Sequence, residues 1–187
     1  MKKTQIVKLA LASIFVALAT VLSFIKVYKL PLGGAITLFS MLPIVIIAYT
    51  LGIKWGLASS FVYSLIQLAC GILFDGVLGW GLTPTALIGT ILLDYIIPFT
   101  ALGLVGFVSK KGYLSLILGT AAVIVIRFLC HLLSGAIIFD IWCEWDSAWL
   151  YSVCYNGSYM LPELIITVIG AAVLFNIPQV KKLIENI

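Results

Sequence analysis

Apolar runs of about twenty residues, separated by short polar stretches, are the feature that most constrains this chain. A helix needs about 20 mostly apolar residues to cross the hydrocarbon core of a bilayer. The 187 residues are 63% hydrophobic and only 10% charged, whereas soluble domains contain about 45–50% apolar and about 25% charged residues. We therefore expect an all-α integral membrane protein that forms a single membrane domain over residues 1–187.

Glycine, proline and charged residues divide the chain into six candidate transmembrane helices. The first begins after Met1-Lys2-Lys3 and also resembles a signal peptide, but it is long enough to span the membrane and we keep it as a helix. The second is short for a full span and contains Pro43, which can kink it. The six expected helices are residues 5–26, 38–52, 56–74, 85–108, 113–139 and 157–176.

The positions of Lys and Arg predict the orientation of the bundle, because cytoplasmic loops keep an excess of both residues. Of the 11 Lys and Arg residues, all but Lys26, Lys29 and Arg127 fall on one side if the N-terminus is inside. Both termini are therefore predicted to be cytoplasmic. The longer, aromatic-rich connections then face outward, and loops of this kind often carry recognition.

Ionisable side chains within the expected helices mark a candidate polar pocket, because charges there usually face the protein interior or a wet cavity. Asp94 and His131 lie in the outer halves of their helices. Gly135, one turn after His131, would let a ligand or a backbone approach closely. A buried pairing network would also explain these residues. That simpler explanation fits Arg127 and Glu163 better, as an ion pair that joins two helices.

The segment between residues 139 and 159 is rich in aromatic side chains. An aromatic belt at the membrane interface accounts for several of them, but with acidic residues between them they would also suit a flat cation through cation–π contacts. Asn156 adds an amide with donors and an acceptor, and Asn156-Gly157-Ser158 is predicted to cap the start of the last helix. The aromatic residues are Phe139, Trp142, Trp145, Trp149, Tyr151, Tyr155 and Tyr159.

Motifs for other chemistry are missing from the sequence. It contains no GxxxxGK[ST], HExxH or GxSxG pattern, so neither ATP hydrolysis nor a familiar hydrolase is indicated. The four cysteines show no metal-binding spacing; Cys143 and Cys154 share one loop and could pair, although free thiols are the simpler alternative. The basic residues do not cluster as a nucleic-acid surface would require. We expect no catalytic residues, no metal and no cofactor.

Four motifs occur in a characteristic order and spacing. They are Leu32-Gly33-Gly34 followed by Met41-Leu42-Pro43-Ile44, then Leu92-Leu93-Asp94-Tyr95, the run from Arg127 through Gly135, and Trp149-Leu150-Tyr151 continuing to Tyr155-Asn156-Gly157-Ser158-Tyr159-Met160. Together they resemble the bacterial thiamine transporter family, the substrate-binding S components of energy-coupling factor (ECF) transporters. The resemblance implies a six-helix, multi-pass protein of the bacterial cell membrane that binds thiamine with high affinity near its extracellular side.

The resemblance also implies roles for individual residues. Asp94 stands at the position of a pocket carboxylate, where a longer Glu is expected in this family. An aromatic residue that stacks on the ligand corresponds to Phe139 or Trp142, and Tyr28 is the candidate gate residue of the first loop. The other implied ligand-facing positions are Tyr95, His131, Gly135, Tyr151 and Asn156.

Partners follow from the resemblance too. Thiamine would be delivered with a transmembrane coupling protein and two ATPase subunits. Ser13 and Ala17 would lie on the face of the first helix that docks on the coupling protein, and their small-xxx-small spacing independently permits close packing of a partner helix.

Three other functions remain open. The chain could be an S component for another vitamin or a thiamine precursor, because a fold does not fix its ligand. It could be a small intramembrane enzyme that uses Asp94 and His131 as acid and base. It could also be a channel or a purely structural membrane subunit.

Overall fold

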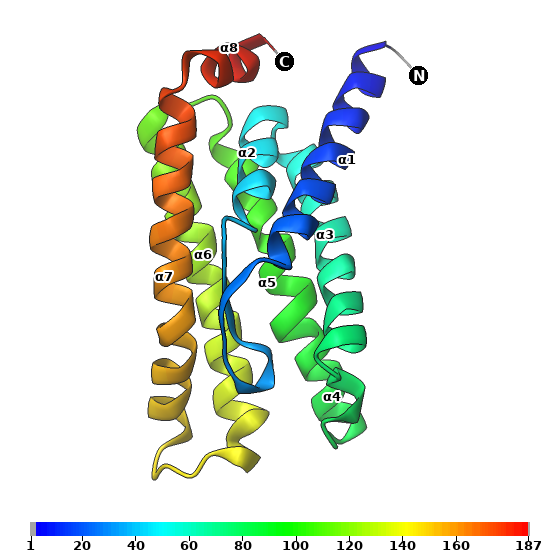
Figure 1. The fold of residues 1–187 in the computed structure, drawn as a ribbon, viewed down its shortest axis with the longest axis vertical. Helices are drawn as coiled ribbons and strands as arrows, with labels where there is room; N and C mark the ends of the chain where they lie inside the picture. Colours follow the sequence, from blue (N-terminus) through cyan, green and yellow to red (C-terminus); the bar gives the residue numbers. More distant parts are fainter. Residues whose placement is uncertain (1–2, 187) are drawn as a thin grey trace.

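The computed structural model describes residues 3–186, which form a bundle of helices running along the length of the molecule (Figure 1). Within this part of the chain, five helices are long and apolar enough to cross a membrane. The expected all-α membrane architecture is therefore present, apart from one short hairpin. The five are α1 (Lys3–Ser23), α3 (Ile53–Phe74), the composite helix Pro84–Val108, α6 (Tyr113–Ile137) and α7 (Ala148–Asn176).

The remaining expected span, α2 (Leu42–Leu51), is shorter than the predicted helix over residues 38–52. Its 10 residues extend about 15 Å, half of the roughly 30 Å hydrocarbon core. Residues 42–50 are all buried, so α2 packs inside the bundle. Pro43 lies in its first turn, where no backbone donor is needed. In the described residues, the six predicted spans are thus five long helices and one short core helix.

The composite helix changes its winding at Pro98. Proline has no N–H for the carbonyl of Asp94, four residues earlier, and its ring crowds that carbonyl. The backbone forms a wider π turn instead, in which the N–H of Ile97 donates to the carbonyl of Leu92. Such turns are frequent at functional sites, and this one carries Asp94 and Tyr95. The parts are α4 (Pro84–Thr90), the π turn η3 (Ile91–Ile96), α5 (Ile97–Ala101) and the 3-10 helix η4 (Leu102–Val108).

Glycines bring this composite helix against α3 without side chains between the two backbones. A Cβ on Gly103 would lie 2.6 Å from the backbone of Gly56, and a Cβ on Gly106 would lie 2.5 Å from the backbone of Ile53. Both distances are too short for any side chain. This contact holds α3 directly against the composite helix.

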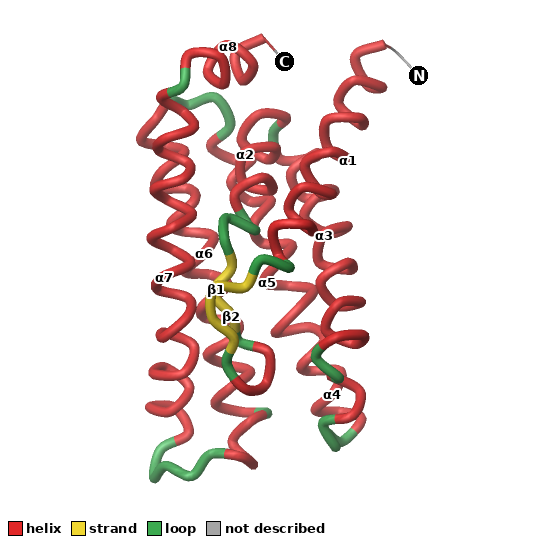
Figure 2. Tube along the Cα trace, viewed as in Figure 1, coloured by secondary structure: helices red, strands yellow, loops and turns green. Residues whose placement is uncertain are grey.

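A β hairpin follows α1 and contains the motif Leu32-Gly33-Gly34, in a stretch where no strands were predicted. Helix α1 ends at Ser23, before its predicted end at residue 26. Strands β1 (Lys26–Lys29) and β2 (Ala35–Thr37) then pair antiparallel. Gly33 has a φ of 92°, a left-handed conformation that glycine adopts without a Cβ clash. The hairpin lies in the middle of the molecule, between the α6–α7 pair and α5 (Figure 2).

Helix α7 begins at Ala148, well before its predicted start at residue 157. The Oγ of Ser147 caps it by accepting a hydrogen bond from the N–H of Leu150 at 3.3 Å. The prediction that Asn156-Gly157-Ser158 caps this helix is therefore wrong. The first turns of α7 were hidden in the sequence because their buried side carries polar residues, Ser152 and Asn156, where an apolar stripe is the usual helix signal.

Both ends of the described chain lie at the same end of the bundle (Figure 1). Helix α8 (Pro178–Asn186), which the sequence analysis did not predict, runs across this end after α7. The two described ends therefore share one side of the bundle, as two cytoplasmic termini would require.

Candidate functional site

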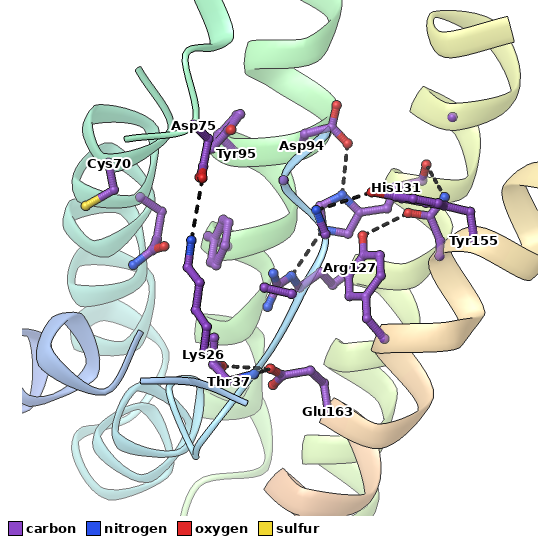
Figure 3. Close-up of a pocket in the computed structure, with 18 of the residues that line it drawn as sticks. Lys26, Thr37, Cys70, Asp75, Asp94, Tyr95, Arg127, His131, Tyr155 and Glu163 are labelled. Carbon is purple, nitrogen blue, oxygen red and sulfur yellow. Dashed lines mark hydrogen bonds and ion pairs between the residues drawn. The ribbon is translucent and has the colours of Figure 1, made fainter. Parts of the chain in front are cut away.

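One cavity gathers most of the residues that the sequence analysis marked as ligand-facing. It encloses about 170 Å³, several times the roughly 30 Å³ that one water molecule occupies in the liquid, so it has room for more than isolated waters. Its lining comes from α1, the hairpin, α3, the π turn, α6 and α7 (Figure 3). The predicted site residues in this lining are Asp94, Tyr95, His131, Gly135, Phe139, Trp142, Tyr151 and Asn156.

Asp94 lies in a side-chain network between the π turn and α6 (Figure 3). Its Oδ1 lies 2.9 Å from Nδ1 of His131, and its Oδ2 accepts a hydrogen bond from the hydroxyl of Ser134. Each carboxylate oxygen thus binds one protein donor and keeps a lone pair. The carboxylate is held in a fixed orientation and can still accept a hydrogen bond from a ligand.

Arg127 sets the tautomer of His131. The Nε–H of Arg127 donates to Nε2 of His131 at 3.2 Å. Because a guanidinium has no acceptor, Nε2 carries no proton in this arrangement, and Nδ1 carries the proton that is donated to Asp94. The site therefore presents a neutral imidazole between a guanidinium and a carboxylate.

Asn156 joins α7 to α6. Its Nδ2 donates to the carbonyl oxygens of His131 at 3.2 Å and Ser152 at 3.0 Å, and its Oδ1 accepts from the hydroxyl of Tyr159 at 2.8 Å. Its donors are thus used within the protein, and a lone pair on Oδ1 remains. A Cβ on Gly135 would lie 2.3 Å from Oγ of Ser152, so this glycine admits the facing helix closely.

Aromatic rings supply the apolar part of the lining. The rings of Tyr151 and Tyr155 are stacked with their centroids 5.9 Å apart. Phe139 lies between Trp80 and Trp142, at centroid distances of 5.7 and 5.4 Å. All five line the cavity. Their faces carry the negative end of the ring quadrupole, which attracts a cation.

The two readings of the aromatic segment apply to different residues. Trp145 and Trp149 lie outside the cavity lining and are 50% and 52% exposed, which suits a belt at the membrane interface. Tyr95, in contrast, is packed inward, with its hydroxyl so close to α3 that a Cβ on Gly71 would lie 2.3 Å from it. Gly71 on α3 therefore leaves the space that the Tyr95 side chain occupies.

Glu163 does not pair with Arg127, so the interpretation of these two residues as an interhelical ion pair is wrong. Oε1 of Glu163 accepts hydrogen bonds from the backbone N–H of Thr37 and from its hydroxyl, the latter at 2.7 Å. Arg127 donates from Nη1 to Sδ of Met41 and lies 4.1 Å from the ring centroid of Phe99. Among the described residues, Asp75 forms ion pairs with Lys26 and Lys29, whereas the contact of Asp94 with His131 joins a carboxylate to a neutral imidazole.

The hairpin forms one wall of the cavity and is tied to α3 by charge. The ammonium groups of Lys26 and Lys29 lie 3.6 and 2.7 Å from Oδ1 of Asp75, just after the end of α3. Tyr28, the predicted gate residue, lies between them on β1 but outside the cavity lining, and it is 57% exposed. The structure therefore separates Tyr28 from the other predicted site residues.

Helix α7 ties down the other side of the hairpin. The hydroxyl of Tyr155 accepts from the N–H of Gly34 at 3.3 Å and donates to the carbonyl of Pro31. The bonds between Glu163 and Thr37 form a second attachment at the end of β2. The hairpin is thus attached to both sides of the cavity that it covers.

Comparison with known proteins decides the family. The chain matches the family described as thiamine transporter protein over residues 9–183. The chain belongs to the thiamine transporter family. It is 33% identical over 186 residues to the thiamine transporter ThiT of Bacillus subtilis (strain 168), with 91% of each chain covered. A solved structure of ThiT from Listeria monocytogenes shares the fold, with a TM-score of 0.76, 22% sequence identity and coverage of 97% of this chain and 99% of that chain.

Membership of this family makes the chain a multi-pass protein of the cell membrane, and a transporter rather than an enzyme. The resemblance of its motifs to the thiamine transporter family is therefore confirmed. The roles of individual residues in binding remain predictions, which the geometry of the cavity makes specific.

Some residues that line the cavity were not predicted to face the ligand. Trp80 was not among the predicted site residues, and Tyr155 was named only as one of the aromatic residues and as part of a family motif; both line the cavity. A signal was present in α7, where buried polar or small residues recur every three to four positions. They are Ser152, Asn156, Tyr159, Glu163, Thr167 and Gly170.

The predicted docking residues Ser13 and Ala17 lie outside the cavity lining. The cysteines are a separate case, because Cys70 lines the cavity and none of the four is paired. Ser13 and Ala17 are exposed on one face of α1, so a partner helix could reach them. All four cysteines are free thiols. The alternative in which Cys143 and Cys154 form a disulfide is therefore not the state that the structure shows.

Proposed function

We propose that this chain is the substrate-binding S component of an ECF-type vitamin transporter and that it binds one thiamine with high affinity in the described cavity. The observation that carries the proposal is the combination of the Asp94–His131 pair with the aromatic lining of the same cavity. Family membership makes thiamine the first ligand to test.

The chemistry of thiamine matches this combination. Its permanently cationic thiazolium suits the faces of Phe139, Trp142 and Tyr151. Its aminopyrimidine offers donors to the remaining lone pairs of Asp94 and of Oδ1 of Asn156. Tyr95 lies beside Asp94 on the π turn and would define the edge of the same site. Asp is shorter than the Glu expected at this position, and the network with His131 and Ser134 holds it in place.

Two observations support access from the extracellular side. The excess of lysines at the end that carries both termini predicts that this end is cytoplasmic. The cavity is walled by the hairpin, in the middle of the molecule, and by the segment with Phe139 and Trp142, which follows α6 at the end away from both termini. We propose that the ligand enters past these segments.

Delivery into the cell would require partners, namely a transmembrane coupling protein and two ATPase subunits, because the sequence has no phosphate-binding loop. The small, exposed face of α1 at Ser13 and Ala17 is the proposed docking surface. Ala17→Trp should then abolish thiamine uptake in cells that supply the partners and leave the affinity of the purified protein unchanged. Normal uptake by Ala17→Trp would exclude this surface.

Calorimetric titration of the purified, detergent-solubilised protein with thiamine tests the central proposal. We expect saturable binding of one thiamine per chain, and tighter binding than for other vitamins or for the separate pyrimidine and thiazole precursors. Absence of saturable thiamine binding by folded protein would refute the proposal. Tighter binding of another vitamin would favour an S component of different specificity.

The site geometry argues against the enzymatic alternative. A general base needs a free lone pair on the imidazole, but Nε2 of His131 accepts from Arg127 and Nδ1 faces Asp94. Recovery of chemically unchanged thiamine after long incubation with the protein is the expected result.

A further inference from the structure

Glu163 leaves one carboxylate oxygen without a partner at the deep end of the cavity. This end lies toward the chain termini, because Arg127 precedes His131 on α6 and Glu163 follows Asn156 on α7. The Glu163 side chain is 2% exposed and lines the cavity. Its Oε1 binds Thr37, whereas its Oε2 is buried without a hydrogen-bond partner among the described residues.

The hydroxyls of Thr37 and Ser40 do not supply the missing donor. Thr37 gives its only hydroxyl hydrogen to Oε1 of Glu163, at 2.7 Å. Oγ of Ser40 lies 2.6 Å from Oγ1 of Thr37, so Ser40 must be the donor of that second bond. The hydrogens of both hydroxyls are therefore already used. Neither Thr37 nor Ser40 therefore has a hydroxyl hydrogen left for Oε2 of Glu163.

Arg127 offers donors at the same end of the cavity. A guanidinium has five N–H groups, and the structure pairs one of them with His131 and one with Sδ of Met41, at 2.8 Å. Met41 directly follows Ser40, which places Arg127 next to the cluster of Ser40, Thr37 and Glu163. In the view of Figure 3, Arg127 lies between His131 and Glu163.

We propose that Arg127 and Glu163 form a deep subsite that binds one neutral group able to donate and accept hydrogen bonds at once, a hydroxyl of the ligand or a water molecule. Such a group donates to Oε2 of Glu163 and accepts from the guanidinium of Arg127. The two protein charges select against charged groups, since a cation would face Arg127 and an anion would face Glu163 in a medium of low dielectric. This subsite is separate from the Asp94–His131 pair, whose atoms all have protein partners.

Crystal structures with and without thiamine test the subsite directly. We expect an oxygen, of thiamine or of water, within hydrogen-bond distance of both Oε2 of Glu163 and the guanidinium of Arg127. A structure that shows ordered waters elsewhere in the cavity but no oxygen at this position, in either state, would overturn the proposal. The ligand-free structure is informative even if thiamine does not bind, so this test is independent of the proposed function.

Binding of two ligands distinguishes a ligand hydroxyl from a water molecule as the occupant of the deep subsite. This second test rests on the proposed function. Thiamine carries one hydroxyl, on the side arm of its thiazolium ring, and an analogue with an ethyl arm lacks it. If the ligand hydroxyl occupies the subsite, the analogue should bind about tenfold more weakly than thiamine. Glu163→Gln should then weaken the binding of thiamine about threefold to tenfold and narrow the difference in affinity between thiamine and the analogue. If water occupies the subsite, both ligands should bind wild type within about twofold of each other.

Thr167→Val is the matched control for Glu163→Gln. Thr167 also lies on α7 and has a buried hydroxyl without a partner, but it lies outside the cavity lining. Valine keeps its shape and removes the hydroxyl. We expect the affinity for both ligands to match wild type. An equal loss of affinity in Thr167→Val and Glu163→Gln would show that α7 tolerates no change in polarity, and would refute a specific role for the deep subsite.

Discussion

The two sides of the cavity are built in different ways. The α6–α7 side is joined by direct hydrogen bonds between the two helices, from Asn156 to the carbonyl of His131 and from Ser152 to the carbonyl of Leu132. The hairpin side is a short two-stranded element that reaches the helices through a few side chains. A two-stranded hairpin has little stability of its own. We therefore infer a permanent wall on the α6–α7 side and a detachable wall at the hairpin, which should open at lower cost.

Function follows from this difference. A ligand enclosed by two permanent walls could neither enter nor leave, whereas one enclosed by two loose walls would not be oriented. The Asp94–His131 pair belongs to the permanent wall, since it lies between the π turn and α6. The attachments at Asp75, Tyr155 and Glu163 belong to the detachable wall. Substitutions in the permanent wall should change equilibrium affinity or stability, and those in the detachable wall should change rates.

Asp94→Asn should have the largest effect on binding. It removes the negative charge that faces a cationic ligand, and a hydrogen bond to a charged group contributes roughly 1.5–3 kcal/mol. We expect about a tenfold to hundredfold loss of thiamine affinity by calorimetry. Asp140→Asn is the control, because Asp140 is exposed and lies outside the cavity lining. Equal thiamine affinities for Asp94→Asn and wild type would show that Asp94 does not bind the ligand.

Gly135→Ala should lower stability rather than specifically affect the ligand. The new Cβ would lie 2.3 Å from Oγ of Ser152, and overpacking of this kind costs about 1–3 kcal/mol. A lower midpoint of thermal unfolding is expected, with partial recovery in the double variant Gly135→Ala/Ser152→Ala. Gly157→Ala on the same helix pair has nothing within 4 Å of its Cβ and should not destabilise the protein. Unchanged stability of Gly135→Ala would mean that the permanent wall can open.

The sequence predicted the permanent wall much better than the detachable one. Apolar runs located the long helices, and the family motifs contain Asp94, His131 and Asn156, all of which line the cavity. The start of α7 was missed because a helix that faces a polar cavity lacks an apolar stripe on that side. The π turn was also missed. Pro98 marked an irregular point in the helix. Whether the backbone there forms a π turn or a kink depends on how neighbouring helices accommodate the carbonyl of Asp94, which Pro98 leaves without its usual N–H donor.

The hairpin could not be predicted, because its strands are only four and three residues long and show no clear alternation of apolar and polar residues. Its place in the cavity depends on contacts between residues far apart in the sequence. Tyr155 meets Gly34 and Pro31 across more than a hundred residues, and Glu163 meets Thr37 in the same way. Tyr28 was therefore predicted as a gate from its position in the loop alone.

Tyr155→Phe should loosen the detachable wall without changing the fold. It removes one hydroxyl that bonds to the hairpin backbone at two points, each contributing about 0.5–1.5 kcal/mol. We expect thiamine to dissociate about threefold to tenfold faster in stopped-flow fluorescence. Tyr28→Phe is the control on the hairpin itself, since Tyr28 lies outside the cavity lining. A faster rate in Tyr28→Phe alone would restore Tyr28 as the gate residue and reject the role of Tyr155.

Asp75→Asn should have the smallest effect. Its ion pairs with Lys26 and Lys29 are partly exposed, with 29% and 50% of the lysine side chains accessible, and pairs of this kind contribute about 0–1 kcal/mol. We expect dissociation of thiamine to quicken by no more than about fivefold at low salt. Salt screens such pairs, so the difference from wild type should vanish as ionic strength rises, whereas the difference for Tyr155→Phe should persist. An effect of Asp75→Asn that is as large at high salt as at low salt would mean that the charge of Asp75 has no part in holding the hairpin.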